Sequence, residues 1–148
     1  MKIRKILLPI DFSEEGERAL KAVGELAAVT HASVVLLHVI ENVGIAPIGE
    51  AAPAPILLPG TTQELELSRK ALEERRKRFP AGVEVATDAL VAPSVPHAIN
   101  DYAAKKGCDV IALSTHGRSG FRRMIMGSVA EAVLRGARVP VLAFPRPG

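Results

Sequence analysis

Two short, largely apolar runs near the start of the chain predict buried β-strands. They cover residues 3–10 and 33–40, and apolar segments of this length are typical of strands that a parallel sheet buries on both faces. Ser13 is placed to cap a helix between them, with glutamates in its first turn. Apolar residues recur along that helix at helical spacing and define its buried face: Ala19, Leu20, Val23, Leu26 and Ala27.

Helices and strands continue to alternate in the second half of the chain. Thr61 and Glu64 have the spacing of a capping box and predict a helix over 61–79. Apolar and polar residues alternate over 83–88, as in a half-exposed strand at the edge of a sheet. A proline in the first turn and a glycine after the last residue then favour a helix over 96–106.

The last third of the chain completes an α/β pattern. Residues 109–114 predict a fourth strand, a last helix begins at Gly127 or Ser128 and runs to Ala137, and Val139–Phe144 predicts a fifth strand. Strands that alternate with helices in this way are typically joined by right-handed crossovers. The pattern therefore predicts an α/β fold, with a single doubly wound parallel sheet and helices on both of its faces.

Residues 42–61 interrupt this alternation. They contain four prolines and three glycines but few charges, so they can form neither a regular helix nor a central strand. We predict a long Pro-rich surface loop here, within a single domain over residues 1–148, because a chain of this length suits one core. The apolar run at the N-terminus stops at Pro9 and is too short for a signal peptide or a membrane span. We therefore expect a cytoplasmic protein without a membrane partner.

Composition narrows the classes of function. Aromatic residues make up only 3% of the chain, which leaves little of the base stacking on which single-strand nucleic-acid binders depend. The formal net charge of +3 suits anion binding but is too small to argue for nucleic acid. The single cysteine, Cys108, excludes an intrachain disulfide and is predicted to be a buried thiol, and the four histidines lack metal-ligand spacing.

The segment 114–128, STHGRSGFRRMIMGS, carries the strongest chemical signal. It contains three glycines and three arginines but no carboxylate, and it follows a predicted strand at its carboxyl end, where open α/β sheets bind ligands. Gly117 permits close approach of a ligand to the backbone. Gly127 and Ser128 begin a helix whose unpaired N–H groups and positive dipole end face the same space. Phosphate is the ligand that this combination favours.

Two common phosphate-binding motifs are absent from this segment. The P-loop of nucleoside triphosphatases requires a lysine directly before its serine or threonine, but Gly127 stands directly before Ser128. The residues from Gly117 to Gly120 do not fit the dinucleotide pattern G-x-G-x-x-G. Both a P-loop enzyme and a nicotinamide-dependent enzyme are therefore disfavoured.

The spacing from Gly117 to Gly127 and Ser128 is G-x9-G-S, and here the chain resembles the universal stress protein family. The nucleotide-binding branch of that family has the pattern G-x-x-G-x9-G-[S/T], in which Ser114 replaces the first glycine; serine is small enough for the phosphate loop to survive. The resemblance extends over nearly the whole chain and includes KILLPIDFSEEGERAL, VVLLHVI and VPVLAF. It implies a Rossmann-like fold with five parallel strands in the order 3-2-1-4-5.

The resemblance also implies a binding site for ATP or AMP. Asp11 would accept hydrogen bonds from ribose hydroxyls, Val39 would meet the adenine edge through its backbone, and Leu113 would line the base or the ribose. Mg²⁺ would be held mainly by phosphates and water, because the glycine-rich segment offers no carboxylate. The complete set of predicted site residues is Pro9, Ile10, Asp11, Val39, Leu113, Ser114, His116, Gly117, Arg118, Gly127, Ser128 and Val129.

Simpler structural roles are open to most of these residues. Gly117 and Gly127 could be ordinary turn and cap glycines, and Asp11 and Ser128 could each cap a helix. The apolar members of the set belong to the core in any case. A lone histidine in a turn, such as His116, is more often structural than catalytic.

Three functions remain open on the sequence alone. The first is a universal stress protein that binds ATP or AMP and acts as a nucleotide-responsive regulatory or binding module in stress adaptation. The second is a slow nucleotide hydrolase or transferase that uses the same pocket, with His116 or Asp11 assisting water. The third is an anion or nucleic-acid binder whose arginines meet backbone phosphates. The apolar last strand also favours pairing at a sheet edge, and the resemblance implies a homodimer through Val139–Phe144.

Overall fold

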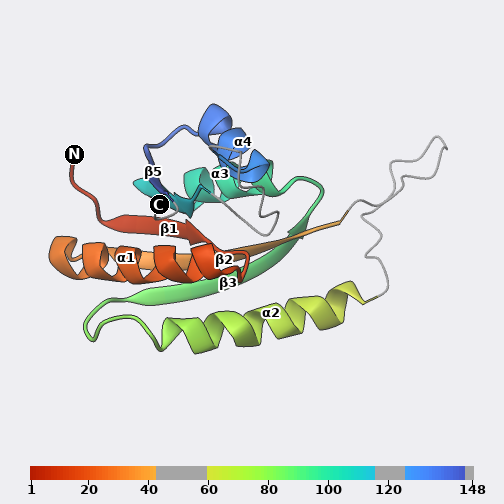
Figure 1. Ribbon diagram of the computed structural model, residues 1–148, viewed down its shortest axis with the longest axis horizontal. Coiled ribbons are helices and arrows are strands. Elements are labelled where there is room, and N and C mark those ends of the chain that lie inside the picture. The colour runs from red at the N-terminus through yellow and green to blue at the C-terminus, as the bar shows by residue number, and fades with distance from the viewer. Residues whose placement is uncertain (43–59, 116–125, 146–148) are drawn as a thin grey trace.

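The computed structural model describes residues 1–42, 60–115 and 126–145 (Figure 1). Strands and helices alternate along the chain, as the hydrophobic pattern predicts. None of the helices within these described residues is both long and apolar enough to span a membrane. The elements are β1 (Lys5–Pro9), α1 (Glu14–Thr30), β2 (Ser33–Glu41), α2 (Thr61–Arg76), β3 (Val85–Ala92), α3 (Val95–Lys105), β4 (Val110–Ser114), α4 (Ser128–Gly136) and β5 (Val141–Phe144).

The strands of the described residues form one parallel sheet. Their order is β3-β2-β1-β4-β5, which confirms the predicted order and the doubly wound α/β fold. The strand β1 lies at the centre, with β2 and β3 on one side and β4 and β5 on the other. The strand β3 lies at an edge, as its alternating pattern predicts. Successive strands are added on one side of β1 and then on the other, and this switch leaves a crevice outside the carboxyl ends of β1 and β4.

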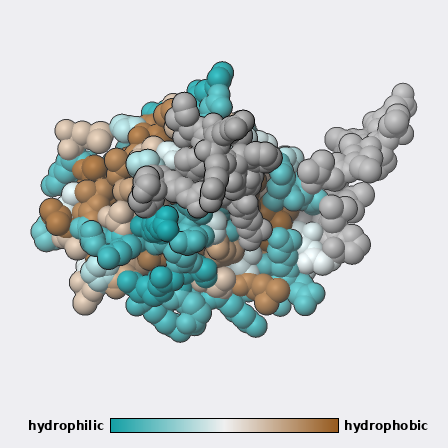
Figure 2. Space-filling model, viewed as in Figure 1, coloured by the Kyte–Doolittle hydropathy of each residue, from teal (hydrophilic) through white to brown (hydrophobic). Residues whose placement is uncertain are grey.

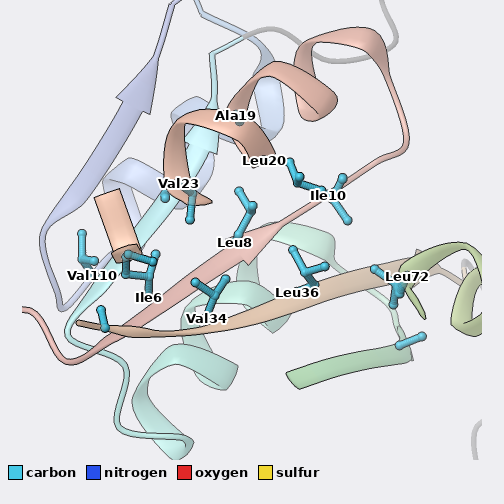
Figure 3. Close-up of a cluster of buried hydrophobic side chains, with 14 residues drawn as sticks. Ile6, Leu8, Ile10, Ala19, Leu20, Val23, Val34, Leu36, Leu72 and Val110 are labelled. Atoms are coloured by element: carbon cyan, nitrogen blue, oxygen red, sulfur yellow. The ribbon is translucent and has the colours of Figure 1, made fainter. Parts of the chain in front are cut away.

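The two faces of the sheet are buried against different pairs of helices. Ile6 and Leu8 of β1 belong to a core cluster with residues of α1 and α2 (Figure 3), whereas Leu7 belongs to a second cluster with residues of α3 and α4. This division follows the two-residue period of a strand. Figure 1 shows α3 and α4 together on one side of the sheet and α2 on the other. The surface over α2 is largely hydrophilic in Figure 2, because the helix turns its charged residues to solvent.

Helix α2 begins and ends differently from the prediction. Its N-cap is Gly60, which has the left-handed φ of 88°, and Thr61 is the first helical residue. The capping box predicted from Thr61 and Glu64 is therefore wrong, and the backbone N–H of Glu64 donates instead to the Gly60 carbonyl oxygen at 2.9 Å. The helix also stops before Phe79, because the chain turns there and places the Phe79 ring close to Gly24 of α1.

The last strand is shorter than the predicted Val139–Phe144. It begins at Val141, because Pro140 has no N–H for the sheet ladder; its carbonyl oxygen accepts from the N–H of Ile111 at 3.0 Å. Within the described part of the chain β5 pairs with β4 alone, so its other side is an edge of the sheet. Leu142 lies on this edge strand and is 37% exposed.

A carboxylate joins the amino ends of two central strands. Asp109, just before β4, accepts hydrogen bonds from the backbone N–H groups of Arg4 and Lys5 at 2.8 and 2.9 Å. These two donors hold the pKa of the Asp109 carboxyl below its usual range. The neighbouring Cys108 is buried, as predicted, and burial raises the pKa of its thiol. The hydrogen bonds of Asp109 hold β1 beside β4, and because the two strands are parallel, both end at the same edge of the sheet.

Candidate functional site

A cavity opens at the carboxyl edge of the sheet, at the predicted crevice. It has a volume of about 440 Å³, which lies in the size range of small-molecule sites. The carboxyl ends of β1, β2 and β4 line it, together with residues of α2, α3 and α4. The cavity therefore occupies the position at which open α/β sheets bind their ligands.

Every predicted site residue that the structure describes lines this cavity. These residues come from parts of the chain that are far apart in sequence, and they meet because β1 lies between β2 and β4. His116, Gly117 and Arg118 lie outside the described residues. The predicted residues brought together are Pro9, Ile10, Asp11, Val39, Leu113, Ser114, Gly127, Ser128 and Val129.

The cavity also contains residues that the sequence did not single out. His38 and Thr115 are chain neighbours of predicted residues, and a carboxyl-end position was the available signal for both. Helices α2 and α3 also contribute residues to the cavity lining. No local sequence pattern predicts this contribution, because it depends on how those helices pack on the sheet. The residues added by the structure are Leu37, His38, Ile40, Glu41, Glu64, Val95, Ile99, Thr115, Ala130 and Val133.

The strand β2 presents an unpaired edge to the cavity. Pairing with β1 ends at Pro9 opposite Leu37, where the N–H of Ile10 donates to the Leu37 carbonyl oxygen at 2.8 Å, but β2 continues to Glu41. In a parallel sheet, successive residues direct their N–H and C=O groups to alternate neighbours. Val39 therefore directs both groups to the side from which β1 has departed. No partner among the described residues takes them up.

Asp11 forms the turn between β1 and α1. Its Oδ1 accepts from the backbone N–H of Ser13 at 3.0 Å and from the Ser13 hydroxyl at 2.5 Å, and Ser13 Oγ in turn caps the N–H of Gly16 at 3.2 Å. Ser13 is the N-cap of α1, as predicted, so the alternative that Asp11 caps this helix is wrong; Asp11 instead holds the capping residue in place. Within the described residues the second carboxylate oxygen, Oδ2, has no hydrogen bond, so one oxygen of a cavity-lining acid is available to a ligand.

The first turn of α4 brings open donors to the cavity. Its N-cap is Gly127, which has no side chain to cap the helix, so the alternative of Ser128 as N-cap is wrong and Ser128 is the first helical residue. The N–H groups of Ser128, Val129 and Ala130 precede the first intrahelical hydrogen bond, and they have no acceptor in the part of the chain that the structure describes. The positive end of the helix dipole lies at the same place.

Backbone contacts hold this helix end against β4. The N–H of Gly127 donates to the Thr115 carbonyl oxygen at 2.5 Å, and the Thr115 N–H donates to Phe144 of β5 at 3.0 Å. Thr115 is almost fully buried, at 6% exposure. The two ends of the glycine-rich segment are therefore fixed to each other and to the sheet.

A comparison with protein families identifies the family to which this fold belongs. The model of the universal stress protein family matches residues 2–145. The chain belongs to this family. It is 28% identical over 162 residues to universal stress protein MJ0577 of Methanocaldococcus jannaschii, covering 97% of this chain and 95% of that protein. A solved structure of MJ0577 has a TM-score of 0.72 and covers 100% of this chain and 99% of that chain.

Two further universal stress proteins of the same fold have been solved with adenine nucleotides. One is in complex with cAMP; it is 18% identical, with a TM-score of 0.63 and 98% of both chains covered. The other is from Archaeoglobus fulgidus in complex with dAMP; it is 23% identical, with a TM-score of 0.64, and 97% of this chain and 98% of that chain are covered. At these identities the likeness establishes the common fold.

In this universal stress protein, Ser114 takes the position of a glycine in the nucleotide-binding pattern of the family. Ser114 is the last residue of β4 and pairs in register with Phe144 of β5. Its backbone continues an extended strand and is not among those with positive φ, so this position does not require glycine for conformational reasons. The change from glycine adds a hydroxymethyl group to the cavity lining without straining the backbone.

Proposed function

We propose that this protein binds an adenine nucleotide, ATP or AMP, at the carboxyl edge of the sheet and acts as a nucleotide-responsive module in stress adaptation. One observation carries the proposal: an unpaired strand edge, a carboxylate and an open helix N-terminus meet in one cavity. They lie on β2, in the turn after β1 and at the start of α4, and they suit the base, the ribose and the phosphates of a single ligand. The adenine nucleotides bound by two proteins of the same fold support it.

The base lies against the edge of β2 in this proposal. The N–H of Val39 would donate to N1 of adenine, and a carbonyl oxygen of the same edge would accept from the 6-amino group. Apolar side chains beside this edge would cover the ring. Val39 and Leu113 are 9% and 6% exposed and belong to the core cluster that includes Ile99 and Val133, all of which line the cavity.

The sugar and the phosphates then follow toward α4. Asp11 Oδ2 would accept from the ribose hydroxyls, and the N–H groups of Ser128 and Val129 would donate to phosphate oxygens at the positive end of the helix. The described residues contain no group of three or more His, Cys, Asp or Glu side chains able to hold a metal. Mg²⁺ would accordingly enter with the nucleotide and be coordinated by phosphates and water.

Inosine triphosphate tests whether the edge of β2 recognises adenine. It carries an oxygen at C6 and a hydrogen on N1, so it reverses both of the groups that the β2 edge would recognise. We expect it to bind at least about tenfold more weakly than ATP, because two hydrogen bonds of about 1 kcal/mol each would be lost and their backbone partners left unpaired. Titration calorimetry with both nucleotides in the presence of Mg²⁺ measures the difference. Equal affinities would refute base recognition by this edge and favour a non-specific anion site.

We further propose that two copies of the chain pair through β5, as the family resemblance implies. The strand is an edge of the sheet, and Leu142 on it and Leu134 on α4 are 37% and 49% exposed. An arginine at position 142 would place a charge in such an interface. We expect light scattering to give the mass of a dimer for the wild type at micromolar concentration and of a monomer for Leu142→Arg. A monomeric wild type would contradict this proposal.

A further inference from the structure

His38 of β2 is hydrogen-bonded to the turn that carries Asp11. His38 Nδ1 lies 2.7 Å from the carbonyl oxygen of Ile10, the residue just before Asp11. A backbone carbonyl oxygen can only accept, so Nδ1 carries the hydrogen and donates it. His38 lines the cavity, and the two-residue period of β2 puts its side chain on the face that Val34 and Leu36 share with α1. The histidine therefore connects β2 to the end of β1, one residue beyond the last paired position.

The same ring supports the residue on the other side of Asp11. Phe12 has a φ of 61°, a left-handed conformation that is rare for a large aromatic residue and persists only where the surroundings fix it. The rings of Phe12 and His38 have centroids 4.5 Å apart. The guanidinium carbon of Arg75 lies 4.6 Å from the Phe12 centroid, and Arg75 is paired with Glu17 of α1 at 2.6 Å. Groups from β2, α1 and α2 thus hold this one turn.

We propose that His38 is a positioning residue for ribose recognition. Its Nδ1–H fixes the carbonyl of Ile10 and its ring supports Phe12, so both neighbours of Asp11 are held in place by one side chain. Asp11 Oδ1 is already committed to Ser13, and holding the turn directs the remaining oxygen, Oδ2, at the ribose hydroxyls. This inference rests on the proposed nucleotide site and adds to it a residue that acts on the ligand through Asp11.

Two variants of His38 separate its contributions. His38→Phe keeps a ring against Phe12 but removes the donor, and His38→Asn keeps a donor near the Nδ1 position but removes the ring. The probes are ATP and 2′,3′-dideoxy-ATP, which lacks both ribose hydroxyls. We expect the wild type to prefer ATP by about tenfold, and His38→Phe to reduce this preference to about twofold while its affinity for the dideoxy nucleotide stays the same. His38→Asn should retain most of the preference.

A role in stability alone would give a different pattern. It would weaken both nucleotides by the same factor and leave their ratio unchanged, and that result would overturn the proposal. Combining His38→Phe with Asp11→Ala should cost no more than Asp11→Ala alone, whereas additive losses would show that His38 acts independently of Asp11. A wild type that binds ATP without preference over the dideoxy form would refute ribose recognition. A wild type that binds neither nucleotide would refute the proposed function itself.

Discussion

Ser128→Asp should lower the affinity for ATP by at least about fivefold and leave the affinity for adenosine nearly unchanged. The substitution puts a negative charge at the first residue of α4, where the proposed site holds phosphate. Two unit charges about 4 Å apart repel by on the order of 1 to 4 kcal/mol, depending on the effective dielectric. Adenosine carries no phosphate, so the new carboxylate has nothing to repel. Titration calorimetry with both ligands measures the two effects separately.

The same substitution should not harm the fold. A carboxylate in the first turn of a helix is stabilising by about 0.3–1 kcal/mol, so the unfolding temperature should stay constant or rise slightly. In the control variant Ser128→Asn, the asparagine side chain has nearly the same shape as aspartate but carries no charge. This variant should bind ATP within about threefold of the wild type. Equal losses of ATP and adenosine affinity in Ser128→Asp, or no loss of either, would place the phosphates elsewhere.

Leu8→Ala should produce the largest loss of stability among single side-chain truncations at the centre of the sheet. Leu8 is fully buried in β1, between β2 and β4, and packs in the cluster under α1 (Figure 3). Deleting such a side chain typically costs about 2–5 kcal/mol, because apolar burial is lost and a cavity is left. For a chain of this size the unfolding temperature should fall by roughly 5–15 °C. Thermal and urea unfolding followed by circular dichroism give both quantities.

An exposed leucine supplies the matched control. Leu67 lies on α2 and is 58% exposed, so Leu67→Ala makes the same chemical change where little packing is lost. Its effect on the free energy of unfolding should stay within about 0.5 kcal/mol. Similar losses for the two variants would mean that the cluster under α1 is not the rigid core described here.

The strands of this fold could be predicted because the burial of each strand determines the hydrophobic pattern of its own segment. Strands β1, β2 and β4 are covered on both faces, so each appears as a continuous apolar run. The location of the site follows from the same runs, since Asp11 and the glycine-rich segment both come directly after one of them. The order of the strands in the sheet could not be predicted in this way, because local patterns do not specify which strands pair. It was available from the resemblance to the family, and the pairing of β1 with both β2 and β4 confirms it.

The parts of the site that escaped prediction depend on tertiary packing. Val95 and Ile99 face the cavity because of the way α3 lies on the sheet, and nothing in their own segment distinguishes them from other core residues. His38 lies in an apolar strand, and its bond to the Ile10 carbonyl exists because β1 turns away at that point. The left-handed backbone of Phe12 is equally invisible in the sequence, since large aromatic residues rarely adopt it.

Calorimetric titration of ATP into the nucleotide-free protein tests most directly whether this cavity binds adenine nucleotide. The protein is purified without added nucleotide, and mass spectrometry of a denatured sample shows whether a nucleotide has been carried through purification. We predict saturable binding of one ATP per chain with a micromolar dissociation constant, or ATP or AMP released from the purified protein. A protein that releases no nucleotide and binds no ATP at millimolar concentration would contradict the proposed function.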